Sequence, residues 1–234
     1  MVKEAGMKIP NPIMWRINLK LTGWWPVAVS AAILAVIFIL EFHLAGSGSE
    51  YETMYVRRAV ETIAPLLFAI QAAFLFGPDN EPALELLLSY PKPLPRLFLD
   101  RLLLVTGMHL AVALAATLVF ALTWHAENLA LSLIRWLAAG IVLAGVAVFT
   151  TQVTRQGVYG TLLAILLWAA SLYGGDGILK RWPWFWPFHV YLQPERFGLG
   201  TYLLNRLALV GIGLGLFLLA MKLLGDEDRL LGTR

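Results

Sequence analysis

Six long runs of apolar residues follow one another along the chain, separated by shorter polar segments. They lie at about 24–43, 59–77, 102–123, 130–150, 157–174 and 200–224. A helix rises 1.5 Å per residue, so about 20 residues cross the ~30 Å hydrocarbon core of a bilayer. The runs are continuously apolar and lack the alternation of a lipid-facing strand. The pattern therefore predicts six transmembrane helices.

Composition agrees with this pattern. Apolar residues make up 59% of the chain and charged residues only 14%, whereas a soluble domain has about 45–50% and about 25%. Too few charges are available to cover a surface that faces only water. The segments between the runs are too short to hold a further domain. We therefore expect residues 1–234 to form a single all-α membrane domain.

A basic segment with tryptophans precedes the first run. Between about 11 and 22 it contains Trp15, Arg16 and Lys20. Apolar and polar residues alternate here with the period of a strand, but an isolated strand at a membrane would leave both of its edges unpaired. We expect an amphipathic helix that lies in the interface, although the period alone leaves both structures open.

The distribution of basic residues predicts an orientation. Lysine and arginine are more frequent before the first run, after the second and fourth runs and at the carboxyl end than in the remaining loops. Basic loops stay on the cytoplasmic side of a membrane. We therefore expect a multi-pass protein of the plasma membrane with both termini in the cytoplasm.

Several kinds of chemistry are excluded by missing residues or motifs. The chain has no cysteine, so disulfides, thiol catalysis and cysteine-ligated zinc are excluded. It has no phosphate-binding P-loop and no paired histidines at a metal-binding spacing. A net charge of +3 is too small to indicate nucleic-acid binding. We expect no catalytic residues, metal site or cofactor in this chain.

Two polar residues lie well inside the apolar runs. Gln71, in the second run, is our candidate for a group that faces a transport pathway. His109, in the third, either packs with a hydrogen bond or lines such a pathway, and the first is the commoner role of a lone intramembrane histidine.

Three charged residues lie closer to the ends of the runs. Arg135 and Arg206 stand within two turns of the start of theirs, where a long side chain can reach the interface. Glu61 is expected to pair with Arg57 or Arg58, one helical turn away.

Two further segments carry recognisable patterns. Gly211 and Gly215 form a G-x-x-x-G motif, which serves close helix packing either within the bundle or against a second copy of the chain. The 175–199 segment is rich in aromatic residues and interrupted by prolines. It is either an interfacial aromatic belt or a pair of short helices that dip into the membrane, and we slightly favour the helices.

The loop after the second run holds the most specific motif. It begins GPDNEPALELLLSYPKPLP at Gly77, with acidic residues first, then a short apolar helix and then prolines. A loop that merely connects two spans needs no apolar helix at its centre. The motif E-x-x-L-E-L-L-L-S-Y-P-x-P resembles the cytoplasmic coupling region of ABC-2-type transporter permeases. Its L-E-x-L and P-x-P-L-P spacing is also similar to the haem-exporter permease of cytochrome c maturation.

The resemblance implies roles for particular residues. The helix that docks on a separate ATPase subunit would contain Glu81, Leu84, Glu85, Leu86, Leu87, Leu88 and Tyr90. Trp15, Arg16 and Lys20 would belong to the elbow helix that precedes the first span.

The resemblance also implies partners and an activity. The partners would be ATPase subunits that carry ATP and Mg²⁺, a second permease copy or paralogue, and the lipid bilayer. The chain would be the permease of an ABC exporter that moves an apolar or amphipathic cargo by alternating access. A haem-exporter-like permease and a membrane assembly factor without an ATPase are the alternatives. An intramembrane enzyme is disfavoured, because facing acidic or histidine residues are lacking.

Overall fold

The computed structural model describes residues 50–75, 94–124, 129–192 and 197–226, together with residues 28, 31, 32, 35, 36 and 39. Within these residues every regular element is a helix, which confirms the all-α prediction. The predicted elbow helix and coupling helix, and most of the first predicted span, lie outside the described residues. The elements are α3 (Glu50–Phe74), α5 (Leu94–Trp124), α6 (Leu129–Thr154), α7 (Gly157–Ala169), the π-helix η3 (Ala170–Gly174), α8 (Gly175–Arg181), the 3₁₀-helix η4 (Pro183–Phe188) and α10 (Leu199–Leu224).

Four helical segments in the described part are long and apolar enough to cross a membrane. They are Leu94–Ala115, Leu133–Thr154, Gly157–Gly174 and Leu199–Leu224. A shorter apolar segment, Glu61–Phe74, forms the second half of α3. The chain is therefore an α-helical membrane protein with at least these four candidate spans.

The observed helix bounds differ from the predicted ones mainly at amino ends. Helix α3 starts at Glu50 and not near 59, and α5 starts at Leu94 and not near 102. Pro95 is the second residue of α5. A backbone N–H at this position has no acceptor within the helix, so the absence of an N–H on proline costs no hydrogen bond. Polar residues at these ends resemble a loop in composition, yet they continue the helix beyond the apolar run.

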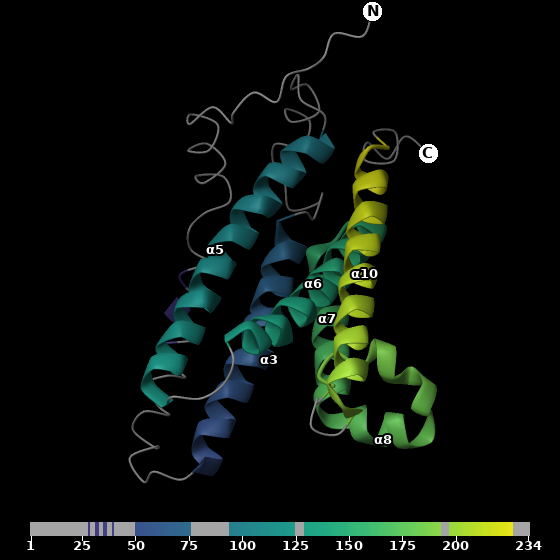
Figure 1. The fold of residues 1–234 in the computed structure, drawn as a ribbon. Coiled ribbons are helices and arrows are strands. Elements are labelled where there is room, and N and C mark those ends of the chain that lie inside the picture. Colours follow the sequence, from purple (N-terminus) through teal and green to yellow (C-terminus); the bar gives the residue numbers. More distant parts are fainter. Residues whose placement is uncertain are drawn as a thin grey trace, which may run out of the picture.

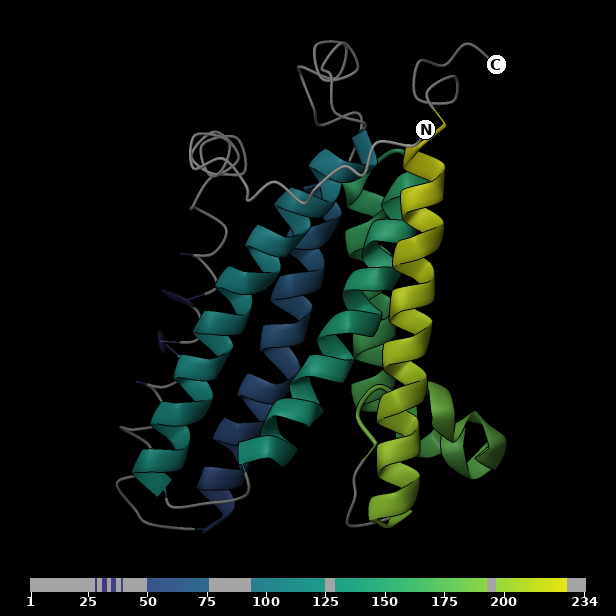
Figure 2. The same cartoon turned by 45° about the horizontal axis from the view of Figure 1, so that its top comes forward.

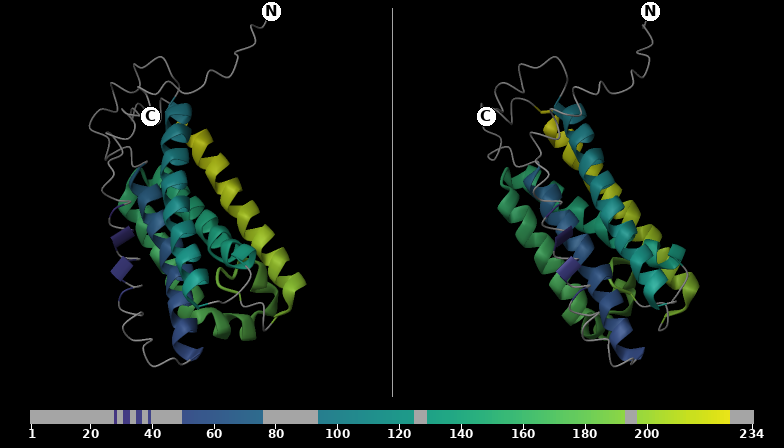
Figure 3. Two further views of the ribbon diagram at one scale, coloured as in Figure 1. Left: turned by 60° about the vertical axis from the view of Figure 1, so that its left-hand side comes forward. Right: turned by 90° about the vertical axis from the view of Figure 1, so that its left-hand side faces the viewer.

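Successive long helices alternate in direction, so α3, α6 and α10 run one way and α5 and α7 the other (Figures 1 and 2). Helix α6 is central and packs against α10, α3 and α7. Helix α5 lies at the side of the bundle, with most of its contacts to α3 (Figure 3). The amino end of α5 and the carboxyl end of α10 lie at the same end of the bundle, while α8 and η4 lie beside the opposite end of α10 (Figure 1).

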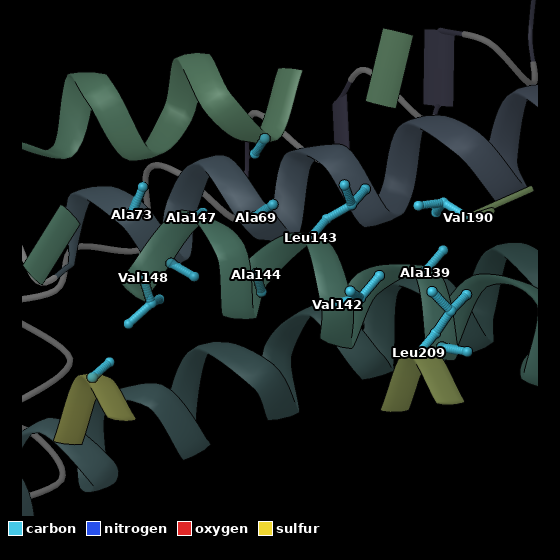
Figure 4. Close-up of a cluster of buried hydrophobic side chains, with 14 of the residues drawn as sticks. Ala69, Ala73, Ala139, Val142, Leu143, Ala144, Ala147, Val148, Val190 and Leu209 are labelled. Atoms are coloured by element: carbon cyan, nitrogen blue, oxygen red, sulfur yellow. The ribbon is translucent and has the colours of Figure 1, made fainter. Parts of the chain in front are cut away.

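Small residues allow α6 to sit at the centre. Ala139, Ala144 and Ala147 are fully buried in the apolar core shown in Figure 4. A β-carbon on Gly145 would lie 2.7 Å from the carbonyl oxygen of Gly213, so the backbones of α6 and α10 meet here. Close backbone approach of this kind stabilises helix pairs in membranes through van der Waals contact.

The predicted G-x-x-x-G motif is not the site of this approach. A β-carbon on Gly211 or Gly215 would meet no atom of the described residues within 4 Å, whereas one on Gly213 would lie 2.7 Å from the carbonyl oxygen of Ile141. Within the described bundle, Gly213 is thus the packing glycine. The alternative, a contact of Gly211 and Gly215 with a second copy, stays a prediction.

The aromatic 175–199 segment contains two short helices, α8 and η4. Pro183 begins η4 and Pro187 lies inside it, which is consistent with a 3₁₀-helix of only six residues. Trp182 and Trp184 are exposed. The pair of helices was expected from the prolines, and their depth in the membrane stays a prediction.

Candidate functional site

A cleft of about 510 Å³ opens between α3, α5, α6 and α10. Its wall is almost entirely apolar, with Phe68 from α3, Leu102 from α5, Ile141 from α6 and Phe217 from α10 among the residues that line it. No lysine, arginine, aspartate or glutamate of the described residues lines it. The cleft therefore suits a ligand whose surface is mainly hydrocarbon.

The peripheral position of α5 leaves this space open. Helix α5 contacts α6 and α10 far less extensively than those two helices contact each other. Gly140 lines the cleft without a side chain, and a β-carbon there would lie 3.6 Å from the ring of Phe68. Leu110 on α5 and Leu214 on α10 line the cleft and are partly exposed, so the cleft opens to the surface of the bundle.

The two polar residues predicted as pathway candidates come together beside the cleft. The imidazole Nε2–H of His109 donates a hydrogen bond to Oε1 of Gln71, and both side chains are buried. His109 also lines the cleft and lies against the ring of Phe68, with ring centroids 5.4 Å apart. The hydrogen bond agrees with the packing role that was considered for this histidine, and its role in a transport pathway stays a prediction.

Two buried donors near the cleft have no partner among the described residues. They are Nε2 of Gln71 and the indole Nε1 of Trp136, which lines the cleft. A buried donor without an acceptor costs about 1–3 kcal/mol, and such groups are uncommon in folded proteins. Trp136 was not among the residues predicted from the sequence, where a tryptophan in an apolar run resembles any other core residue.

A second group of polar residues lies near the amino end of α10 and is called the polar junction. It consists of Glu61, Arg135, Asn205 and Arg206. Nη1 of Arg135 lies 3.4 Å from Oε1 of Glu61. Arg206 donates from Nη1 to the carbonyl oxygen of Val190 at 2.7 Å.

Arg206 and Asn205 together hold the backbone after η4. Arg206 donates from Nη2 to the carbonyl oxygen of Leu192 at 3.1 Å, and its guanidinium lies 4.7 Å from the centre of the Tyr202 ring. Asn205 donates from Nδ2 to the carbonyl oxygens of Trp186 at 2.8 Å and His189 at 3.1 Å. Backbone carbonyl groups at the end of η4 and just after it thus find side-chain donors on α10.

The segment after η4 and helix α7 are both bonded to α3. Nε1 of Trp168 and the hydroxyl of Tyr191 donate to the carbonyl oxygen of Thr62, at 2.9 and 3.2 Å. Burial raises the pKa of the Tyr191 hydroxyl, although Arg206 acts in the opposite direction, so the hydroxyl stays protonated and donates. Pro65 lies three residues after Thr62, and a proline inside a helix disturbs the backbone bonds of the preceding turn.

The polar junction corrects the expectation for two arginines. Arg135 and Arg206 do not reach out to an interface, because their exposed fractions are only 7% and 4%. Glu61 lies beside Arg135 on α6, a contact that was not expected. The side chains of Arg57 and Arg58 lie outside the described part, so the pairing of Glu61 with one of them stays a prediction. These contacts join residues far apart in the sequence, so helical spacing could not predict them. The feature of the sequence that could have indicated the polar junction is the adjacent pair Asn205 and Arg206, which follows a proline-rich loop.

Among the described residues no group of histidine, aspartate and glutamate side chains could hold a metal ion. The seven predicted coupling residues and the three elbow residues lie outside the described part. No known protein-family model matches the chain, and neither curated proteins nor solved structures show a significant match to it.

Proposed function

We propose that this chain is the membrane permease subunit of an ATP-driven exporter of the ABC-2 type, with a cargo that is apolar or amphipathic. The observation that carries the proposal is the apolar cleft of about 510 Å³ between α5 and the α3, α6 and α10 helices. A bundle with only a structural role gains stability by closing such a space with side chains. An open apolar cleft among membrane helices instead supports the binding of a hydrocarbon-rich cargo.

The sequence of the loop between α3 and α5 supports an ATPase partner. Its 81–90 segment has the acidic, leucine-rich and proline-terminated pattern of a coupling helix. The chain enters α5 at Leu94, only a few residues later. A push on the loop is therefore delivered to α5, which is the wall of the cleft with the fewest contacts to the rest of the bundle.

The mechanism that we propose is alternating access. ATP binding brings two ATPase subunits together, and each moves the loop attached to α5 of one permease copy. Rotation of α5 against α6 and α10 widens the cleft toward one side of the membrane and narrows it toward the other. The basic residues that flank the loop assign this end of the bundle to the cytoplasm.

Co-purification with an ATPase tests the proposal. Leu84, Leu87 and Leu88 share one face of the predicted coupling helix by their spacing, and burial of each leucine stabilises docking by about 1.5–3 kcal/mol. The double variant Leu87→Ser and Leu88→Ser should lose the ATPase that co-purifies with the tagged wild-type chain from its native membrane. The matched control is Leu230→Ser with Leu231→Ser, another leucine pair outside the apolar runs.

Two further measurements show whether the 81–90 segment docks on an ATPase or packs against its own bundle. The melting temperature of the purified coupling variant should stay within about 2 °C of wild type, since about 1 kcal/mol shifts the melting temperature of a chain this size by only ~2–4 °C. The purified complex should hydrolyse ATP and the isolated chain should not bind it. A falling melting temperature with unchanged co-purification, or saturable micromolar ATP binding by the chain alone, would refute the permease assignment.

A further inference from the structure

We infer that the cleft binds a neutral, lipid-like molecule that has a hydrocarbon body and at least one carbonyl-type acceptor, as a diacylglycerol does. Identification of this molecule as cargo rests on the proposed function, but its binding does not. Three features of the cleft point to such a ligand: its volume, the lack of charge among its described lining residues, and the unpaired indole N–H of Trp136.

The volume and lining limit the size and polarity of the part of the ligand that the cleft holds. A space of about 510 Å³ lies within the range of roughly 300–1,000 Å³ that is usual for small-molecule sites. Among the described residues of the wall, Thr106, His109 and Trp136 alone bring side-chain nitrogen or oxygen atoms, and the others are hydrocarbon apart from Gly140 and the thioether of Met221. A polar ligand would therefore lose most of its hydration without replacement.

The lack of charge excludes an ionic head group inside the cleft. No lysine or arginine of the described residues lines the wall, so a phosphate or carboxylate there would have no cation to offset its desolvation. The buried cations Arg135 and Arg206 are instead engaged by Glu61 and by backbone carbonyl oxygens. The ligand portion that occupies the cleft is therefore neutral.

The unpaired indole donor of Trp136 favours a ligand that carries an acceptor. Trp136 lines the cleft and is more than nine-tenths buried, yet its indole N–H has no acceptor among the described residues. The amide nitrogen of Gln71 is also unpaired among the described residues, but Gln71 does not line the cleft, so the argument rests on Trp136. An ester or amide carbonyl can accept from such a donor, whereas a pure hydrocarbon leaves it unpaired. This is why we infer a lipid with carbonyl groups and not an alkane-like filler.

The position of the opening suggests how the ligand enters. Leu137, Leu214 and Leu218 line the cleft and are exposed on the outside of the bundle. These residues belong to helices that are long and apolar enough to lie in the membrane. A hydrophobic molecule dissolved in the bilayer can therefore reach the cleft sideways, without passing through water.

Photolabelling of the full chain in lipid nanodiscs tests the inference. The probe is a diacylglycerol with a diazirine in one acyl chain, and labelled residues are mapped by mass spectrometry. We expect saturable labelling of cleft residues on α5 and α6. Unlabelled diacylglycerol should compete, whereas a phosphatidic acid with the same acyl chains and hexadecane should each compete at least about tenfold less well.

Substitutions separate the cleft from the lipid-facing surface. Leu214→Trp fills the cleft and should reduce specific labelling about tenfold, because it removes the space that the acyl chain occupies. Its control, Leu204→Trp, lies outside the cleft on the same helix with similar exposure, 59% against 51%, and should label like wild type. Trp136→Phe keeps a ring but removes the donor, and should weaken diacylglycerol about fivefold while leaving hexadecane unchanged.

The outcomes are decisive in both directions. Non-saturable labelling spread over the outer faces of α7 and α10, or equal labelling of Leu214→Trp and Leu204→Trp, would overturn the site. If phosphatidic acid competes as well as diacylglycerol, the site does not select a neutral ligand. If hexadecane competes equally well, the indole donor of Trp136 plays no part in binding. If Trp136→Phe loses stability, the competition series on the wild-type chain still decides. Loss of the site with an intact ATPase complex would leave the proposed function standing, and the reverse result would leave the site standing.

Discussion

The guanidinium of Arg206 on α10 donates a 2.7 Å hydrogen bond to the backbone carbonyl oxygen of Val190, sixteen residues earlier in the chain. Both residues are buried. A charged side chain inside a membrane bundle is stable only when such partners replace its hydration. This bond therefore fixes the segment after η4 to the last helix.

We expect Arg206→Met to destabilise the fold. The change leaves the carbonyl oxygens of Val190 and Leu192 without their donor on α10, at a cost of about 2–4 kcal/mol. The measurement is thermal unfolding of the purified chain in detergent. Arg181→Met, which removes an exposed cation from α8, is the control and should change little. Equal melting temperatures for the two variants would show that the polar junction contributes no stability.

The close approach of α6 and α10 predicts different effects for neighbouring glycines. Gly213→Ala places a methyl group 2.7 Å from the Ile141 carbonyl oxygen and should cost about 1–3 kcal/mol. Gly211→Ala meets nothing within 4 Å among the described residues, and alanine favours a helix over glycine by up to ~1 kcal/mol. Melting temperatures should therefore fall for the first variant and hold or rise for the second. The opposite order would contradict the helix packing described for this pair.

The hydrogen bond between His109 and Gln71 predicts a coupling energy. Gln71→Leu and His109→Phe each remove one partner and leave the other buried without it, so each should destabilise the chain by about 1–3 kcal/mol. The double variant should cost less than the sum of the single variants by ~1 kcal/mol, because the second change removes the stranded group. Thermal or chemical unfolding of the four chains measures this difference. Strict additivity would show that the pair does not act as a unit.

Single cysteines can test the predicted topology without background, because the chain has none of its own. Cysteines that replace Ser47, Glu127 or Gly177 should react with an impermeant thiol reagent added to intact cells. Those that replace Lys8, Asn80, Gln156 or Thr233 should react only after permeabilisation. Reaction of the cysteine at position 80 from outside would place the loop before α5 on the wrong side for an ATPase.

The sequence predicts the long helices well because their signal is local. The sixth run was placed at 200–224, and α10 is Leu199–Leu224. The fourth was placed at 130–150, and α6 is Leu129–Thr154. Continuous apolar residues determine these helices whatever their neighbours are. The first eight residues of α5 were missed because Pro95, Arg96 and Asp100 resemble loop residues, although a proline is compatible with the first turn of a helix.

The candidate sites were harder to predict because they depend on packing. Gln71 and His109 were each selected as polar residues in apolar runs, but nothing in their spacing placed them side by side. The nearness of Arg206 to its helix start predicts that its side chain reaches the interface. This prediction fails because the position in the sequence does not show which segments surround that turn. The cleft itself depends on which helix faces were left uncovered, and this is a property of the assembled bundle.

The length of α5 has a mechanical consequence. With 31 residues it measures about 46 Å along its axis, against ~30 Å for a hydrocarbon core. Tilt accommodates part of the difference, and the charged residues Arg96 and Asp100 favour projection of the amino end into the aqueous phase. His109 lies about 22 Å along the same rigid rod from Leu94. A rotation imposed on the amino end of α5 would therefore be transmitted along one unbroken helix to the level of His109 and the cleft.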